Sequence, residues 1–190
     1  MNKQELRIVG KNCTTQTLRA VLREYSDTWR QDLTVSWTEM YQTGETLLAW
    51  KREENISGLW GEKPTMITAT LEDGIGQGLK MIHLFSQVAG IDVVSLGLMQ
   101  TEESIINACI KQAPDFLGMT VLQLDSEERL SHIVDHIPKE TQVVVGGPIF
   151  NMMDSEDLSK KRYLVLNTVS VYLDFLLDWQ GYKHDQLHKL

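Results

Sequence analysis

The sequence has only two cysteines, Cys13 and Cys109, among 190 residues. They make neither a disulfide framework nor a Cys-x-x-Cys metal or redox site. No apolar run approaches the roughly 20 residues that a membrane span requires, and the first five residues show no apolar stretch typical of a secretory signal. We therefore expect a cytoplasmic protein with no membrane association, in which Cys109 is a small core residue.

Basic charge is also scarce, and it is unevenly placed. Residues 1–64 contain nine Lys/Arg and nine Asp/Glu, whereas residues 65–190 contain nine and seventeen, so the second segment carries the whole net charge of −8. An acidic body disfavours direct binding to nucleic acid, because that affinity depends on Lys and Arg neutralising phosphates. The one basic cluster, residues 160–162, is only three residues long and is typical of a solvated loop.

The first third of the chain has a helical pattern. Apolar residues recur at helical spacing from Leu18 to Trp29, after a start signal at Thr14. A second helix is expected from Leu33 to Leu48, with Gly44 as a weak point, and residues 55–64 have the composition of a linker. We expect residues 1–64 to form a helical appendage or cap, and residues 65–190 to form the main domain.

Four of the five tryptophans lie in this appendage: Trp29, Trp37, Trp50 and Trp60. One interpretation is that they pack the appendage against the main domain or against a partner subunit, including a second copy of the chain. The alternative is that one of them covers a ligand.

From residue 65 onward, short apolar runs alternate with amphipathic segments. The runs 66–70, 91–96, 116–121, 143–145 and 163–166 are expected to be strands, and helical periodicity between them indicates helices. Thr101 is expected to cap one helix, and Asp125 with Glu128 to form a capping box for the next. This alternation predicts an α/β fold with a flavodoxin-like, doubly wound, five-stranded parallel sheet. Ligands of such sheets bind at the carboxyl ends of the strands. We therefore expect the binding residues in the loops that follow strands one, three and four.

The loop after the first strand, residues 71–79, is rich in glycine and opens a helix. Glycines at this position let backbone N–H groups approach a phosphate at the helix N-terminus. The loop is not a P-loop, because no Gly-Lys-Ser/Thr follows, and it is not a dinucleotide fingerprint, because Leu79 stands at the third glycine position.

Three loops together resemble those of cobalamin-binding domains. Asp73-x-Ile75-x-x-Gly78 is similar to the family's Asp-x-His-x-x-Gly, and Thr120-x-Leu122 to its Ser-x-Leu. The twin glycines at 146 and 147 resemble its Gly-Gly after the fourth strand. The resemblance extends over roughly residues 65–150, so the chain is identified as a divergent member of the cobalamin-binding superfamily.

The resemblance implies that the nucleotide tail of a corrinoid lies in a slot between the sheet and its helices. Thr120 keeps the hydroxyl of the family's serine, and the twin glycines leave room for the tail, although a tight turn alone would also explain them. The cofactor-binding residues that the resemblance implies are Asp73, Gly74, Ile75, Gly76, Gly78, Thr120, Leu122, Gly146, Gly147 and Pro148.

Two departures from the family pattern limit what can be carried over. Ile75 replaces the histidine that coordinates cobalt in the family, and its side chain has no lone pair. Asp73 thereby loses its usual partner, and capping the following helix is the alternative role for it. In addition, residues 166–169 contain no glycine where the family usually has a glycine-rich loop, and the appendage is short for the four-helix cap that often precedes the domain.

The remaining titratable residues do not form a recognisable catalytic set. Glu72 and Asp73 are adjacent on a loop and point differently, so they are not interpreted as an acid/base pair. Two histidine pairs have i,i+4 spacing but lack an evident third ligand, and surface or tail positions explain them. The five histidines are His83, His132, His136, His184 and His188.

These features lead to three hypotheses. The first is a corrinoid-binding protein without histidine ligation, acting as a carrier or as a tetrapyrrole-dependent sensor. The second is a corrinoid methyl carrier or small mutase subunit that works with a separate catalytic partner. The third is a degenerate fold that binds a protein. The expected cofactor is cobalamin or a related corrinoid, with haem as the alternative, and the expected partner is an enzyme or a regulator protein.

Overall fold

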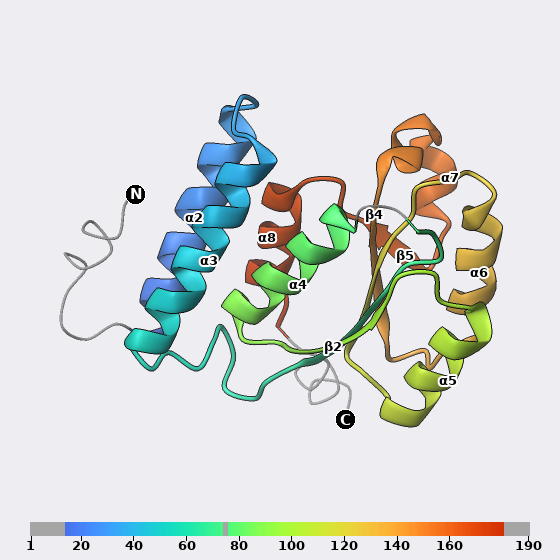
Figure 1. The fold of residues 1–190 in the computed structure, drawn as a ribbon, viewed down its shortest axis with the longest axis horizontal. Helices are drawn as coiled ribbons and strands as arrows, with labels where there is room; N and C mark the ends of the chain where they lie inside the picture. The colour runs from blue at the N-terminus through green and yellow to red at the C-terminus, as the bar shows by residue number, and fades with distance from the viewer. Residues whose placement is uncertain (1–13, 74–75, 181–190) are drawn as a thin grey trace, which may run out of the picture.

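The computed structural model describes residues 14–73 and 76–180. Five parallel strands form one sheet in the order β2-β1-β3-β4-β5 (Figure 1). This is the predicted flavodoxin-like, doubly wound fold. The strands are β1 (Thr65–Ala69), β2 (Asp92–Gly97), β3 (Phe116–Thr120), β4 (Gln142–Gly146) and β5 (Tyr163–Val165).

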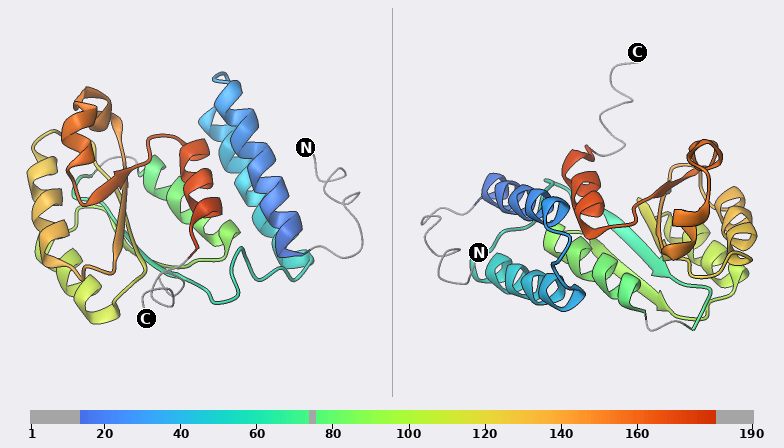
Figure 2. Two further views of the ribbon diagram at one scale, coloured as in Figure 1. Left: turned by 180° about the vertical axis from the view of Figure 1, so that it is seen from behind. Right: turned by 90° about the horizontal axis from the view of Figure 1, so that it is seen from above.

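Helices cover both faces of the sheet. On one side lie α4 and α8, with α2 and α3 stacked outside them, and on the other side lie α5 and α6 (Figures 1 and 2). The helices are α2 (Thr15–Gln31), α3 (Trp37–Glu53), α4 (Gln77–Ala89), α5 (Glu102–Gln112), α6 (Ser126–His136), α7 (Ser155–Ser159) and α8 (Val169–Asp178), and the short 3₁₀ helix is η1 (Pro148–Met152).

The strand residues divide between two cores because successive side chains point to opposite faces. Met66, Phe116 and Val144 pack with the helices of the α4 side, whereas Ile67 and Leu117 pack with those of the α5 side. Every residue of β3 is buried. A central parallel strand covered on both faces is predominantly apolar, and in β3 only Thr120, at the carboxyl end, has a polar side chain.

The two N-terminal helices share the core of the α4 side. Trp29 of α2 meets the edge of Phe85 of α4, with ring centroids 5.6 Å apart. Gly44 of α3 faces α4 so closely that a Cβ atom there would lie 2.6 Å from Leu84 Cδ2. Gly44, which was expected to be a weak point of its helix, is therefore the residue that lets α3 and α4 pack closely. The division of the chain at residues 64 and 65 stays a prediction.

A polar network joins α2 to α8. The Asp174 carboxylate accepts hydrogen bonds from Arg23 (2.9 Å) and from Ser26 Oγ (2.8 Å), and it also pairs with Arg30. Ser26 is buried. The Asp174 side chain is 23% exposed, so its interactions are less screened than the pair of Asp178 with Arg23, because the Asp178 side chain is 71% exposed.

Several local expectations are confirmed and others are wrong. Cys109 is fully buried, and burial raises the pKa of its thiol to about 12. Thr101 caps α5 by accepting from the Ser104 N–H (3.1 Å). The expected capping box at Asp125 is wrong, because Asp125 already has helical backbone angles and its side chain makes no cap bond.

Two further differences concern element boundaries. Leu33 is 89% exposed and precedes α3, because Ser36 caps that helix in a capping box with Glu39. The segment between β4 and β5 contains η1 and α7, which were not expected. Within the described ranges, no helix is long and apolar enough to cross a membrane.

We expect Asp174→Ala to lower the free energy of unfolding by about 1–3 kcal/mol, because a partly buried acceptor of three donors is lost. Asp178→Ala on the same helix is the control and should cost about 0.5 kcal/mol or less, since its pair is exposed. Urea denaturation measures both. Equal losses would show that the Asp174 network does not hold α2 against α8.

Candidate functional site

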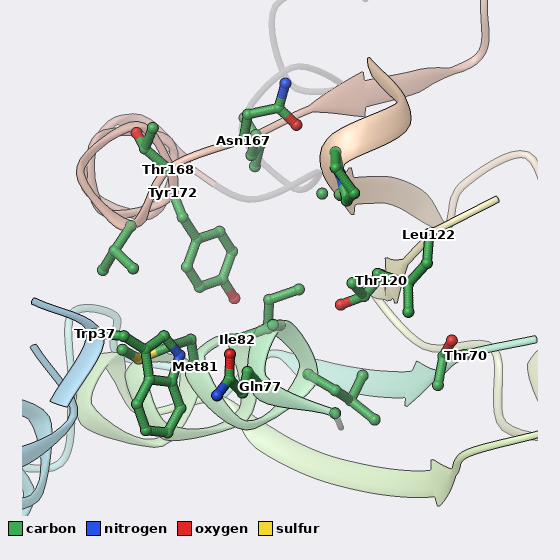
Figure 3. A pocket seen from close by; sticks show the side chains of 18 of the residues that line it. Trp37, Thr70, Gln77, Met81, Ile82, Thr120, Leu122, Asn167, Thr168 and Tyr172 are labelled. Carbon is green, nitrogen blue, oxygen red and sulfur yellow. The ribbon is translucent and has the colours of Figure 1, made fainter. Parts of the chain in front are cut away.

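A cavity of about 650 Å³ opens at the carboxyl ends of the strands, between α4 and α8. Figure 3 shows side chains from the sheet, both helices and α3 converging on it. Its size is that of a small-molecule or cofactor site, and its walls are mostly apolar. The loops after β1, β3 and β4 all reach it, as expected for a doubly wound sheet.

The N-terminus of α4 borders this cavity. Gly76 is the N-cap residue, with φ +67°, and it offers no side chain to the first-turn N–H groups. Gly76, Gln77 and Gly78 all line the cavity. An uncapped helix start leaves backbone donors and the positive end of the helix dipole for a ligand, which favours an anionic group.

Gly78 and Thr120 meet at the base of the cavity. A Cβ atom on residue 78 would lie 2.8 Å from Thr120 Oγ1, so glycine is needed for α4 to rest against the end of β3. Thr120 Oγ1 is buried and has no hydrogen-bond partner among the described residues. A buried hydroxyl without a partner is costly, and it marks a position where a ligand can supply the missing bond.

The twin glycines serve two purposes. Gly147 has φ +140°, and a Cβ atom there would lie 1.9 Å from the carbonyl oxygen of Val121, so its backbone position excludes any side chain. Gly146 has a milder restriction, with Leu166 O at 3.2 Å from its Cβ position. The tight-turn interpretation therefore applies to Gly147, and both glycines also line the cavity.

Another wall comes from the segment after β5 and from α8. Residues 166–169 line the cavity although they contain no glycine. Tyr172 also lines it, with its hydroxyl 2.6 Å from Ser86 Oγ. Burial raises the pKa of the Tyr172 phenol, and the hydrogen bond with Ser86 opposes the shift only in part. The phenol is therefore neutral near pH 7 and acts as a hydrogen-bonding group.

A buried carboxylate, Glu72, connects the loops beneath the cavity. It is 7% exposed, and it accepts from Thr70 Oγ1 (2.8 Å) and from the Leu122 N–H (3.2 Å). The backbone carbonyl oxygen of Glu72 accepts from the Met99 N–H (3.2 Å). Glu72 thus ties the loop after β1 to the loops after β2 and β3.

Seven of the ten sequence-predicted site residues line this cavity. Asp73 is exposed and does not line it, and the suggestion that Asp73 caps α4 is wrong because that helix has no side-chain cap. Gly74 and Ile75 lie outside the described residues. The seven that converge are Gly76, Gly78, Thr120, Leu122, Gly146, Gly147 and Pro148.

The three described histidines do not line the cavity. His132 Nδ1 lies 2.8 Å from Glu102 on α5, and His83 contacts Gln87 on its own helix. Within residues 14–73 and 76–180, no group of three His, Cys, Asp or Glu side chains is arranged to hold a metal ion. His184 and His188 lie outside this range.

Sequence patterns did not identify the apolar walls or the role of Glu72. Met81, Ile82 and Val169 have the spacing of ordinary core residues, and no local signal distinguishes a residue at a cavity wall from one in a filled core. Trp37 also lines the cavity, which agrees with the alternative that one tryptophan covers a ligand.

Residues 64–166, more than half of the chain, match the family described as "B12 binding domain". The chain belongs to this family. A curated relative, the 2-hydroxyisobutanoyl-CoA mutase small subunit of Aquincola tertiaricarbonis, is 29% identical over 100 residues, covering 51% of this chain and 71% of the relative.

Solved structures of cobalamin-binding proteins share the fold of this B12-binding chain. A novel cobalamin-binding protein from Desulfitobacterium hafniense has a TM-score of 0.71 at 13% identity, covering 88% of this chain and 82% of that one. The monomethylamine corrinoid protein of Methanosarcina barkeri has a TM-score of 0.57 at 15% identity, covering 74% and 65%. The methanol:cobalamin methyltransferase complex MtaBC from the same organism gives 0.56 at 14% identity, covering 92% and 71%. The haem alternative finds no support in these relatives.

We expect Glu72→Ala to lower the free energy of unfolding by about 1–3 kcal/mol, because the Leu122 N–H and the Thr70 hydroxyl then lose their acceptor. Asp73→Ala, on the exposed neighbour, should change it by no more than about 0.5 kcal/mol. Urea denaturation compares the two variants. If Glu72→Ala proved as mild as Asp73→Ala, the Glu72 carboxylate would not be what joins the loops.

Proposed function

We propose that this protein binds cobalamin or a related corrinoid through its nucleotide tail, and that it carries no catalytic centre of its own. The observation that supports this best is the glycine-lined cavity at the carboxyl edge of the sheet, with the unpaired Thr120 hydroxyl at its base. Membership of the B12-binding family agrees with that ligand.

The lining residues fit the parts of such a tail. The uncapped start of α4 suits its phosphate, since backbone donors and a helix dipole meet there. Thr120 Oγ1 supplies a hydroxyl at a place where a Cβ on Gly78 would leave no room. The apolar side chains of Met81, Ile82 and Val169 suit an aromatic base.

When bound, the corrinoid supplies a cobalt centre whose bond to carbon is the reactive group. Among the described residues that line the cavity, Tyr172 is the only one with a titratable side chain. We therefore propose that the cavity residues hold the cofactor and keep water away from it, and that they take no part in proton transfer. The residue at the family's histidine position, Ile75, offers no lone pair to cobalt. We therefore propose that this chain holds the cofactor without a histidine ligand.

The catalytic groups then have to come from a partner polypeptide. The relative that is a mutase small subunit favours a place as the corrinoid subunit of a two-part enzyme. The structural similarity to corrinoid proteins of methyl transfer keeps a methyl carrier as the second candidate. A sensor role, a homodimer formed through the tryptophan-rich helices, and a cytoplasmic location stay predictions from the sequence.

The direct test is to mix purified protein with hydroxo-, methyl- and adenosylcobalamin and to pass each mixture through a gel-filtration column. We expect a coloured protein fraction. Gly78→Val should weaken binding about fivefold or more, because the added side chain would displace Thr120 at a cost of about 1–3 kcal/mol. Gly61→Val is the control, since a Cβ there meets nothing within 4 Å.

A colourless protein fraction with all three cobalamins would remove the proposal and favour a fold used for protein binding. Thermal shift provides an independent check, since a ligand at a hundred times its Kd stabilises by about 2.7 kcal/mol. Thr120→Val keeps the side-chain shape, and it tests the hydroxyl if Gly78→Val does not fold.

Replacing Ile75 with histidine tests the missing ligand. We expect Ile75→His to change the absorption spectrum of the bound cobalamin, because an imidazole nitrogen then becomes available to cobalt. The EPR spectrum of the Co(II) form should gain splitting from one nitrogen. Ile75→Leu is the control and should leave both spectra as in the wild type. Identical spectra for the histidine variant would mean that residue 75 does not face the metal.

A further inference from the structure

Trp37 belongs to the N-terminal helices, yet it forms part of the cavity wall. It is the first residue of α3, directly after the N-cap Ser36 and inside the capping box that Ser36 forms with Glu39. Its ring stacks on Tyr41, with centroids 5.1 Å apart and an interplanar angle of 13°. Figure 3 shows its indole beside Met81 and Gln77 of α4, with the nitrogen-bearing edge turned toward the cavity. Because one face of the ring is stacked on Tyr41, the indole can make a polar contact only through the edge that carries the nitrogen.

The indole N–H of Trp37 has no acceptor. Its Nε1 atom is buried and without a hydrogen-bond partner among the described residues. An indole nitrogen can only donate, so no change of tautomer relieves this. Trp60, by contrast, donates to the carbonyl oxygen of Trp179 at 2.9 Å. A buried donor without an acceptor requires an explanation, and in a cavity wall a bound ligand is one that supplies the acceptor.

Trp50 shows that an unpaired indole is not by itself the mark of a ligand site. Its Nε1 atom is also buried and unpaired, and its side chain is 2% exposed. Trp50 lies on the same helix but is not among the residues that line the cavity. Of the described tryptophans, Trp37 alone therefore combines an unpaired donor with a place in the cavity wall.

We propose that Trp37 determines which lower base the protein accepts, by donating its indole N–H to a ring nitrogen of the base. This inference rests on the proposed function. A benzimidazole or purine base held in a slot away from cobalt has an acceptor nitrogen that no longer binds metal. Among the described residues that line the cavity, only the Trp37 indole and the Thr120 hydroxyl are buried side-chain donors without a partner. A phenolic base has no such nitrogen and gains nothing from Trp37.

The test compares the dissociation constants of four corrinoids for the wild type, Trp37→Phe and Trp50→Phe. The corrinoids are cobalamin, one with an adenine base, one with a phenolic base, and cobinamide, which has no tail. Phenylalanine keeps an aromatic ring but removes the N–H. We expect Trp37→Phe to weaken binding of the two nitrogenous corrinoids about five- to tenfold, the worth of one hydrogen bond. Its affinity for the phenolic corrinoid should not change.

The control and a second measurement keep the result interpretable. Trp50→Phe should leave all four constants as in the wild type. In the wild-type protein labelled with ¹⁵N-tryptophan, the Trp37 indole proton should move downfield with cobalamin and not with the phenolic corrinoid. This measurement needs no variant at residue 37 to fold.

The outcomes separate the two proposals. If the wild type binds cobalamin but Trp37→Phe weakens all tailed corrinoids equally, Trp37 only packs against the tail and this inference is overturned. The same follows if the Trp37 indole signal does not move. If the wild type and Trp50→Phe bind none of the four corrinoids, the proposed function itself fails, and this inference with it.

Discussion

The three central strands of the sheet, β1, β3 and β4, are covered on both faces, and that constraint governs the rest of the molecule. Every residue of β3 is covered, with Phe116 packed on the α4 side and Leu117 on the α5 side. A ligand cannot enter through such a sheet, so only its edges and strand ends remain open. At the carboxyl ends the chain leaves a cavity between α4 and α8, which pack side by side on one face.

The polar contacts around this cavity are arranged for holding the loops in place. The buried carboxylate of Glu72 accepts hydrogen bonds from the Thr70 hydroxyl and from the Leu122 N–H, which fixes the loops after β1 and β3 relative to each other. Tyr172 and Ser86 share a hydrogen bond between α8 and α4. Because these groups are hydrogen-bonded to each other, the buried side-chain atoms without a partner at the cavity are, among the described residues, Trp37 Nε1 and Thr120 Oγ1. A site of this kind selects a ligand by shape and by hydrogen bonds.

The N-terminal helices contribute more than a cover. They share one core with α4 and α8, and Gly44 lets α3 approach α4 within contact of Leu84. The close approach of α3 brings its first residue, Trp37, to the cavity wall. A site that draws residues from both segments couples the position of these helices to whatever occupies the cavity, because their packing and the cavity wall use the same side chains.

Much of the fold follows from the sequence, because alternating apolar strands and amphipathic helices leave few topologies. The signature loops at Gly78, Thr120 and Gly146 were likewise identifiable, because they resemble the family's motifs and follow the expected strands in the expected order. The capping box expected at Asp125 was wrong, because a local motif does not reveal a backbone that is already helical at that residue.

The sequence by itself determined the five-stranded sheet, the loops that meet at its carboxyl edge, and the absence of a histidine at position 75. Only the tertiary structure decided that Glu72 and not Asp73 is the buried carboxylate, and that Trp37 belongs to the cavity while Trp50 does not. The physical reason is that burial and hydrogen-bond partners depend on contacts between elements distant in the chain. Neighbouring residues with similar side chains can therefore meet quite different surroundings.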